Sequence, residues 1–313
     1  MPCFFGIDIG ASFTKLAAHT EGKRYIFDRF ETAELPPLLL LRKIGKQILG
    51  LREDFCSDSK GAIGVGIPGF FNRTTGKIIR LTNLPGWREV APTTVLSDET
   101  DMPAYIENDA NLFALYVLFR ELKLERANAV CLVLGSGVGG GIILDGKVYI
   151  GTKGFASEPG HIIIQMDGEP CGCGKRGCLE AYVGGLALEK LAKKQLERTG
   201  ESLPYDFHFY PDEIYRLKDR HEAFNAAISI SQKALAIGMA NMVEIFDPEY
   251  IFIGGGFLSR YPDFYRRAFE IMRDYISSPR RRIKFRLVKN SEQAAVKGAV
   301  YLAKTKSEEE EDE

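Results

Sequence analysis

The chain has 313 residues, of which 45% are hydrophobic and 27% charged, and its formal net charge is −1. These are ordinary globular values with room for two domains, and the balanced charge argues against nucleic acid as a bulk electrostatic partner. No apolar run reaches the ~18 residues of a membrane span. The start, MPCFFGIDIG, lacks the basic and long apolar regions of a signal peptide. We therefore expect a cytoplasmic protein with no membrane partner.

The first segment predicts three strands joined by small-residue turns. Cys3 to Ile9 is a buried apolar strand, and Thr14 to His19 and Arg24 to Phe30 are two more. Such a strand and hairpin can wrap backbone N–H groups around a phosphate. Taken alone, it is equally well an ordinary β-hairpin.

The same pattern occurs again in the second half of the chain. The apolar strand Ala129 to Leu134 runs into GSGVGGG (Gly135 to Gly141), and IILDGKVYIG follows. We interpret this as an internal repeat of two related halves. Glycine weakens a strand interior, so five glycines in seven residues indicate close approach of a ligand rather than packing. We predict an anionic ligand, although no Walker A pattern is present.

Between these segments lies a strand-to-helix turn, ENDAN, followed by helical spacing from Leu112. Taken in isolation, Asn108 and Asp109 favour helix capping; the same position also suits a ligand site at the end of a strand in an open α/β sheet. Both interpretations stay open. Asn83, in a loop, could hydrogen-bond a polar substrate, and Trp87 is expected to anchor a core.

A cysteine cluster beside a histidine predicts a metal site. Cys171, Cys173 and Cys178 have the spacing C-x-C-x4-C, and His161 precedes them. Three thiolates and one imidazole complete a tetrahedral shell for structural Zn²⁺; the alternative is a set of free or buried thiols. In a reducing compartment we expect metal binding rather than disulfides. Glu158 and Glu180 flank this stretch.

The rest of the chain is predicted to be mainly helical. Leu179 to Arg198 forms two helical segments broken at Gly184-Gly185, and Glu222 to Phe246 forms a long helix. Tyr250 to Ile253 is a strand that ends in the turn Gly254, Gly255 and Gly256. A late strand, Ile283 to Val288, precedes a final helix, Glu292 to Lys304, and the acidic tail from Ser307 is expected to be disordered.

Together these motifs resemble the ROK family of sugar kinases and sugar-responsive repressors, from Phe5 to about Ala303. The matching segments are DIGASFTK, GVGIPG with NLPGW, ENDAN, LGSGVGGGI, EPGH with CGCGKRGCLE, and DPEYIFIGGG. The resemblance implies an α/β, two-domain, actin/hexokinase-like (ribonuclease-H-like) fold with a central cleft and a structural zinc knuckle. It places residues 1–107 and 291–306 in a small domain and residues 108–290 in a large one, with 307–313 as the tail.

The resemblance also assigns site residues. Asp109 would be the general base, and Asn83, Asn108, Asp109, Glu158, His161 and Glu180 would contact the sugar. His161, Cys171, Cys173 and Cys178 would hold Zn²⁺, and Asp8 would organise the Mg²⁺ that accompanies ATP. The phosphate and nucleotide loops would be formed by Asp8, Gly10, Ser12, Thr14, Lys15, Gly135, Ser136, Gly137, Gly139, Gly254, Gly255 and Gly256.

The implied activity is ATP-dependent phosphorylation of a hexose, glucose at the 6-hydroxyl first, by a homodimer. Alternatives are an N-acetylated amino sugar or fructose as substrate, and polyphosphate as donor, because DIGASFTK is closer to polyphosphate-using glucokinases of this family. Pro159 stands where an aliphatic residue is more common, and Ser136 stands where threonine is usual. A sugar-sensing repressor is disfavoured, because the first predicted strand begins near Cys3 and leaves no room for a DNA-binding domain.

Overall fold

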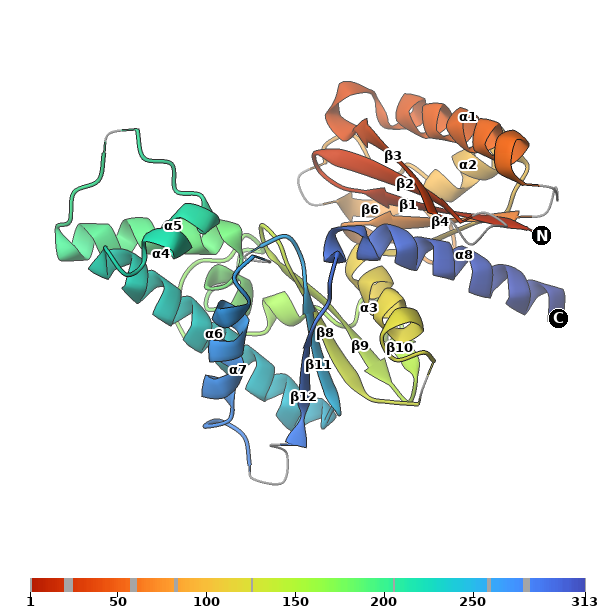
Figure 1. The fold of residues 1–313 in the computed structure, drawn as a ribbon. Coiled ribbons are helices and arrows are strands. Elements are labelled where there is room, and N and C mark those ends of the chain that lie inside the picture. Colours follow the sequence, from red (N-terminus) through yellow and green to blue (C-terminus); the bar gives the residue numbers. More distant parts are fainter. Residues whose placement is uncertain are drawn as a thin grey trace. The chain divides into compact units, whose positions relative to one another are not determined.

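The computed structural model describes residues 2–19, 25–56, 61–81, 84–124, 126–204, 206–257, 260–277 and 282–312. The chain divides into two compact units, each with a sheet and helices (Figure 1). The first unit comprises Met1–Glu125, Val148–Ala156 and Gln293–Glu313, and the second comprises Arg126–Lys147 and Ser157–Glu292.

Strands and helices alternate along much of the chain. The strands are β1 (Cys3–Ile9), β2 (Phe13–His19), β3 (Tyr25–Glu31), β4 (Gly61–Ile67), β5 (Gly69–Phe71), β6 (Ile78–Leu81), β7 (Ala104–Asn108), β8 (Ala129–Leu134), β9 (Val138–Leu144), β10 (Lys147–Tyr149), β11 (Tyr250–Gly254) and β12 (Lys284–Leu287). The α-helices are α1 (Pro37–Phe55), α2 (Pro92–Thr100), α3 (Asp109–Arg120), α4 (Gly185–Thr199), α5 (Pro211–Leu217), α6 (Glu222–Phe246), α7 (Pro262–Met272) and α8 (Ala294–Asp312).

The two large sheets have the same topology. Their orders are β3-β2-β1-β4-β7 and β10-β9-β8-β11-β12. In each sheet the first strand pairs antiparallel with the strand after it and parallel with a later strand across a helical connection. This correspondence confirms the internal repeat that the sequence predicted.

Helices cover both faces of the first sheet (Figure 1). Alternate residues of β1 divide between the faces, as the two-residue period of a strand requires: Phe5 and Ile7 pack with Ile44 of α1, whereas Phe4 packs with Val300 of α8. The apolar cluster that includes Ile44 of α1 also contains Trp87, which is 2% exposed. The predicted role of Trp87 as a core anchor is therefore confirmed.

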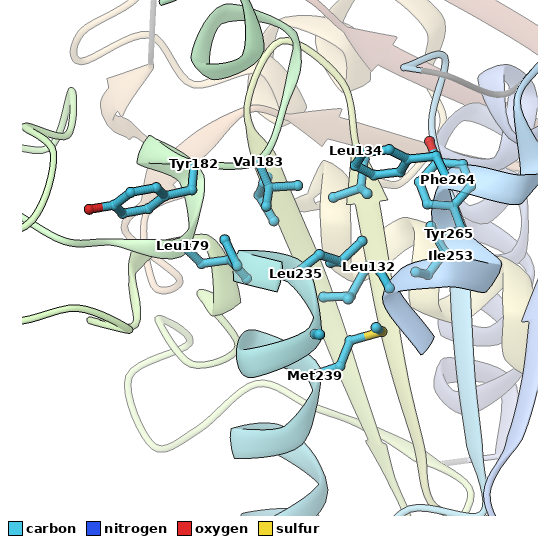
Figure 2. Close-up of a cluster of buried hydrophobic side chains, with 14 of the residues drawn as sticks. Leu132, Leu134, Leu179, Tyr182, Val183, Leu235, Met239, Ile253, Phe264 and Tyr265 are labelled. Carbon is cyan, nitrogen blue, oxygen red and sulfur yellow. The ribbon is translucent and has the colours of Figure 1, made fainter. Parts of the chain in front are cut away.

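The second unit is built around a core between its sheet and α6 (Figure 2). Leu132 and Leu134 of β8 and Ile253 of β11 meet Leu235 and Met239 of α6 there. Figure 2 also shows Phe264 and Tyr265 of α7 on one side of this cluster and Leu179, Tyr182 and Val183 on the other. Residues 179–183 lie directly after the cysteine stretch, so its end is anchored in the core.

Two expectations on chain organisation need correction. Residues 108–290 were expected to form the large domain, but residues 148–156 cluster with the first unit, and so does α3, which packs along α8. The acidic tail was expected to be disordered from Ser307, but α8 continues through Asp312. Spaced pairs such as Lys304–Glu308 and Lys306–Glu309 lie on its last turns, and such pairs stabilise a helix.

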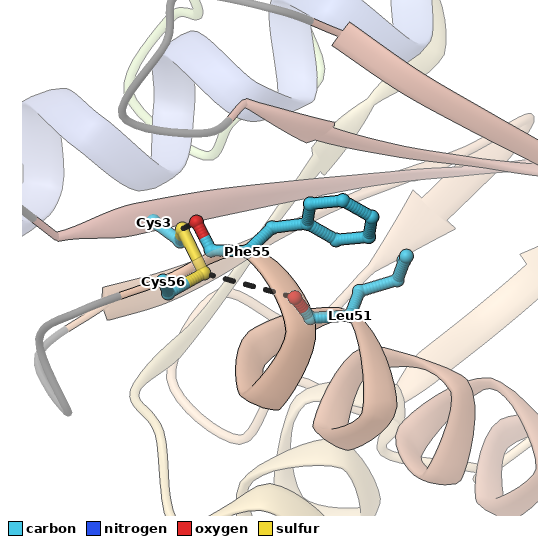
Figure 3. Close-up of a disulfide and its surroundings, with 4 residues drawn as sticks. All are labelled: Cys3, Leu51, Phe55 and Cys56. Atoms are coloured by element: carbon cyan, nitrogen blue, oxygen red, sulfur yellow. Dashed lines mark hydrogen bonds between the residues drawn. A yellow bond between two sulfur atoms is a disulfide. The ribbon is translucent and has the colours of Figure 1, made fainter.

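One cysteine pair contradicts the expectation that thiols here bind metal rather than form disulfides. Cys3 of β1 and Cys56, directly after α1, form a disulfide with their Cα atoms 6.0 Å apart (Figure 3). The chain returns antiparallel over the sheet through α1, which brings two cysteines 53 residues apart into contact. The sequence alone offered no spacing rule for this pair.

Neither α2 nor α5 was predicted. Both α2 and α5 begin at a proline, Pro92 and Pro211, in the first helical position, where proline is favoured. None of the helices in the described part of the chain has the length and apolarity that crossing a bilayer requires.

Candidate active site

The first unit gathers carboxylates at one edge of its sheet. Asp8 of β1 is level with Gly66 of β4, and Gly66 is level with Glu107 of β7. Because these three strands are parallel, their carboxyl ends share an edge, which is where open α/β sheets bind ligands. Asn108 ends β7, and Asp109 begins α3 at the same edge.

Asp8 is a buried carboxylate paired with a lysine. Its Oδ2 lies 3.3 Å from Lys15 Nζ. Burial raises the pKa of Asp8, and the Lys15 cation opposes this rise. A buried carboxylate that is only partly neutralised can accept a further cation, so Asp8 fits the predicted role at Mg²⁺, a cation that prefers oxygen ligands.

The turn after β1 is closed by backbone and side-chain hydrogen bonds. The Gly10 N–H donates to the Phe13 carbonyl at 3.0 Å, and the Thr32 hydroxyl donates to the Gly10 carbonyl at 2.8 Å. Thr14 is fully buried, and its hydroxyl lies 3.0 Å from that of Thr32. Thr14 thus contributes to the internal structure of the turn, whereas Ser12 is exposed at its tip.

Asn108 is a helix cap, as one of the two open interpretations held. Its Oδ1 accepts from the N–H groups of Ala110 at 2.9 Å and Asn111 at 3.3 Å. Its Nδ2 lies 3.4 Å from the Gly69 carbonyl. Asp109 Oδ1 accepts from Ala110 N–H at 2.9 Å. Capping therefore holds Asn108 in place beside Asp109. This arrangement is compatible with a role for both residues in a ligand site.

Glu107 is a residue whose importance sequence reasoning missed. Its Oε1 accepts from the Asn108 N–H at 2.9 Å and from Asn111 Nδ2 at 3.0 Å. A buried glutamate at the end of a strand is unusual unless it is paired. The glutamate of ENDAN, where a strand gives way to a helix, was the signal available in the sequence. Its hydrogen bonds fix the peptide that leads into Asp109.

The second unit gathers glycines at the equivalent edge of its own sheet. Gly135, Ser136 and Gly137 follow β8, and Gly255 and Gly256 follow the parallel strand β11. The N-terminus of α4 joins them, because Gly185 N–H donates to the Gly135 carbonyl at 2.9 Å. No neighbouring atom would meet a Cβ within 4 Å at Gly135 or Gly256. These two positions stay consistent with the predicted ligand approach.

Two other glycines of the stretch Gly135 to Gly141 are explained by packing. This differs from the expectation that a ligand, rather than packing, accounts for the glycines there. A Cβ at Gly137 would lie 2.2 Å from Glu180 Oε2, and one at Gly140 would lie 2.4 Å from Pro159 Cγ. Gly140 lies in β9, as does Gly139, which pairs with Val133. The stretch 157–180 therefore packs directly onto the glycine-rich strand.

The four predicted metal ligands come together. One ligand atom from each of His161, Cys171, Cys173 and Cys178 can be chosen so that all lie within 4.8 Å of one another. The Cys173 and Cys178 sulfurs are 3.7 Å apart, and Cys171 Sγ is 3.8 Å from His161 Nδ1. Bonds of ~2.3 Å to a tetrahedral Zn²⁺ would separate two sulfurs by ~3.8 Å. The donor set and spacing fit a zinc ion.

Glu158 and Glu180 flank this cluster in different surroundings. Glu180 Oε2 accepts from the Val138 N–H at 2.9 Å, directly after the glycine loop. Burial raises the pKa of Glu158; His161 opposes this rise and Glu180 adds to it. The His161 N–H donates to the Glu158 carbonyl at 3.0 Å in one short turn. The second unit thus brings Glu158, His161 and Glu180 into one region.

The predicted site residues are therefore divided between the units. Asp8, Asn108 and Asp109 lie in the first unit, and the glycine loop, the Gly254 to Gly256 turn, Glu158, His161 and Glu180 lie in the second. Asn83 lies outside the described residues.

Two α/β units of the same topology, each with a glycine-containing turn at the carboxyl ends of its parallel strands, define an actin/hexokinase-like protein. The ROK family model matches residues 4–306, and the chain belongs to the ROK family. It is 33% identical over 269 residues to a glucokinase of Halalkalibacterium halodurans, covering 81% of this chain and 80% of that protein.

Two further relatives cover almost the whole chain. An N-acetyl-D-glucosamine kinase of Erwinia tasmaniensis is 27% identical, with coverage of 96% of this chain and 98% of that protein. The crystal structure of a ROK hexokinase from Thermus thermophilus superimposes with a TM-score of 0.82 at 25% identity, covering 98% and 99% of the two chains.

Proposed function

We propose that the protein is an ATP-dependent sugar kinase that phosphorylates a hexose, with glucose at its 6-hydroxyl as the preferred substrate. The observation that carries the proposal is the placement of Asp109. It is a carboxylate at the start of α3, held next to a capping asparagine, at the sheet edge that also carries Asp8 and Lys15. The glucokinase relative supports glucose as the first choice.

In this proposal Asp109 accepts the proton of the attacking hydroxyl. General-base assistance of this kind typically contributes ~10²–10⁴-fold. Asn83, Asn108, Glu158, His161 and Glu180 would pair the sugar hydroxyls, because each unpaired buried polar group costs ~1–3 kcal/mol. Phosphoryl transfer otherwise needs positioning and charge stabilisation. The N–H groups of the glycine turns and Lys15 would supply these, and Mg²⁺, bound with ATP near Asp8, would neutralise phosphate charge.

The zinc ion in this proposal does no chemistry. Three cysteines and one histidine fill a tetrahedral shell and leave no position for a reacting water. The cluster would instead fix the loop that carries Glu158, His161 and Glu180; its Cys171 and Cys178 are buried, whereas Cys173 is exposed.

A second candidate substrate is an N-acetylated amino sugar. The observation in its favour is the N-acetyl-D-glucosamine kinase relative, which aligns over nearly the whole chain. The polar groups named above would serve either sugar. Because of the DIGASFTK loop, polyphosphate stays an alternative phosphoryl donor. We also propose that the protein is a homodimer, which its mass in solution would check.

A coupled phosphorylation assay over a panel of hexoses and amino sugars tests the proposal, with ATP and polyphosphate compared as donors. We expect the highest kcat/KM for glucose with ATP. A higher value for N-acetylglucosamine would move the assignment to the second candidate. Absence of turnover on every sugar with both donors would contradict a sugar kinase.

A further inference from the structure

Arg73 connects three segments of the first unit that are distant in sequence. It lies in the turn between β5 and β6, where the Asn72 side chain accepts the N–H groups of Thr74 and Thr75. Although the turn is exposed, the Arg73 side chain is only 30% exposed. A tight turn thus presents an arginine whose side chain is partly covered.

The first segment that Arg73 contacts is the one that carries the proposed base. Its Nη2 lies 2.8 Å from Glu107 Oε1 and 2.9 Å from Oε2. The Glu107 side chain is 12% exposed, and the same Oε1 accepts the Asn108 N–H. Arg73 therefore compensates the buried charge of the carboxylate that orients the peptide before Asp109.

The second segment is the loop from residue 150 to 156. A Cβ at Gly154 would lie 1.6 Å from Arg73 Nε, so the guanidinium lies directly on this glycine. On the hairpin side, the Arg73 guanidinium carbon is 5.0 Å from the centre of the Phe71 ring. The rings of Phe70 and Phe155, 5.3 Å apart, join the same hairpin and loop independently.

We propose that Arg73 is a positioning residue that sets two parts of the site through one guanidinium: the Asn108-Asp109 turn through Glu107, and the loop at Gly154, four residues before Glu158. This proposal rests on the proposed sugar kinase function and adds a residue outside the motifs that carry it. Arginine suits the place because its planar group can pack on a backbone and bond a carboxylate together, which a lysine ammonium cannot.

The test compares Arg73→Met, which keeps the apolar stem, with Arg73→Lys, which keeps the charge. Arg80→Met is the matched control, because Arg80 is an exposed arginine on β6 of the same hairpin. For each, kcat and KM for sugar and ATP are measured. Hydrogen–deuterium exchange is followed in peptides covering residues 107–111 and 150–156, and in α6 as a reference.

We expect Arg73→Met to lower kcat by ~10–100-fold, the cost of a misplaced catalytic group, while the KM for ATP changes by less than about threefold. Exchange should rise in both peptides and stay unchanged in α6. Arg73→Lys should recover part of kcat and the protection of residues 107–111, but not that of residues 150–156. Arg80→Met should behave as wild type.

A kcat for Arg73→Met within about twofold of wild type, or an exchange increase spread evenly over the first unit, would overturn the proposal. If wild-type protein turned over no sugar, the proposed function would fail separately. The exchange experiment would still test Arg73. A rise in hydrogen–deuterium exchange confined to the two peptides in Arg73→Met would support its positioning role, and no rise would overturn it.

Discussion

Glu180 shows how one side chain can serve two loops. The sequence placed it at the end of the cysteine stretch, and the resemblance gave it a sugar contact. The structure adds a hydrogen bond from the Val138 N–H to Glu180 Oε2, and Gly137 leaves the space in which this carboxylate sits. A residue proposed for sugar binding therefore also fixes the backbone of the proposed phosphate loop.

Because of this double contact, we expect alanine substitutions of Glu180 and Glu158 to change different KM values. Glu180→Ala should raise the KM for both sugar and ATP, since a lost hydrogen bond to a charged group is worth ~1.5–3 kcal/mol, or ~10–100-fold. Glu158→Ala should raise the KM for sugar alone. Steady-state kinetics with each substrate varied in turn provides the measurement. An unchanged KM for ATP in Glu180→Ala would show that the hydrogen bond to Val138 does not contribute to ATP binding.

Residue types alone could not decide how Asn108 is used. Capping and substrate contact were both open, and the structure shows the capping bonds without removing the other role. The glycine loop gave a similar lesson. Gly135 and Gly256 have open space, whereas Gly137 and Gly140 are required by the side chains of Glu180 and Pro159. Composition could not separate these causes, because the contacting residues are distant in sequence.

At the scale of elements, the cysteine knuckle (residues 161–180) was predictable because its ligands are close in sequence. Its outer ligand offers a clean test, since Cys173 is exposed whereas Cys171 and Cys178 are buried. Cys173→Ser should therefore remove the metal without opening a core cavity.

We expect elemental analysis to find about one zinc per chain in wild type and to find it lost in Cys173→Ser. The KM for sugar should rise in that variant, because the loop carrying Glu158 and His161 loses its tether. Cys131→Ser is the control, as this buried cysteine lies in β8 and is not one of the four ligands. Full zinc content in Cys173→Ser would refute the assignment of this ligand.

The Cys3–Cys56 disulfide is the element-scale feature that the sequence did not predict. It closes a loop of 53 residues from β1 through α1. In the chain-entropy model such a closure stabilises the folded state by ~4 kcal/mol. Long-range pairings depend on how strands and helices stack, and neither cysteine has a local partner that would indicate it.

At the scale of the whole molecule, the repeated topology was the most predictable property. Two apolar strands followed by small-residue turns, Cys3 to Ile9 and Ala129 to Leu134, became the centres of two sheets with the same order. The division of the chain was less predictable. The helix after Asp109 joins the first unit because α8, near the end of the chain, packs along it. A contact between segments so far apart leaves no trace in local periodicity.

Asp109 is proposed as the base of a sugar kinase, and the decisive measurement of this role is the kcat of Asp109→Asn with ATP and the preferred sugar. Asparagine keeps the shape and an oxygen for the Ala110 N–H, but it cannot take a proton. We predict a fall in kcat of ~10²–10⁴-fold, with a sugar Kd by calorimetry within about threefold of wild type. A kcat within tenfold of wild type (~1.4 kcal/mol or less in activation free energy) would show that Asp109 is not the general base.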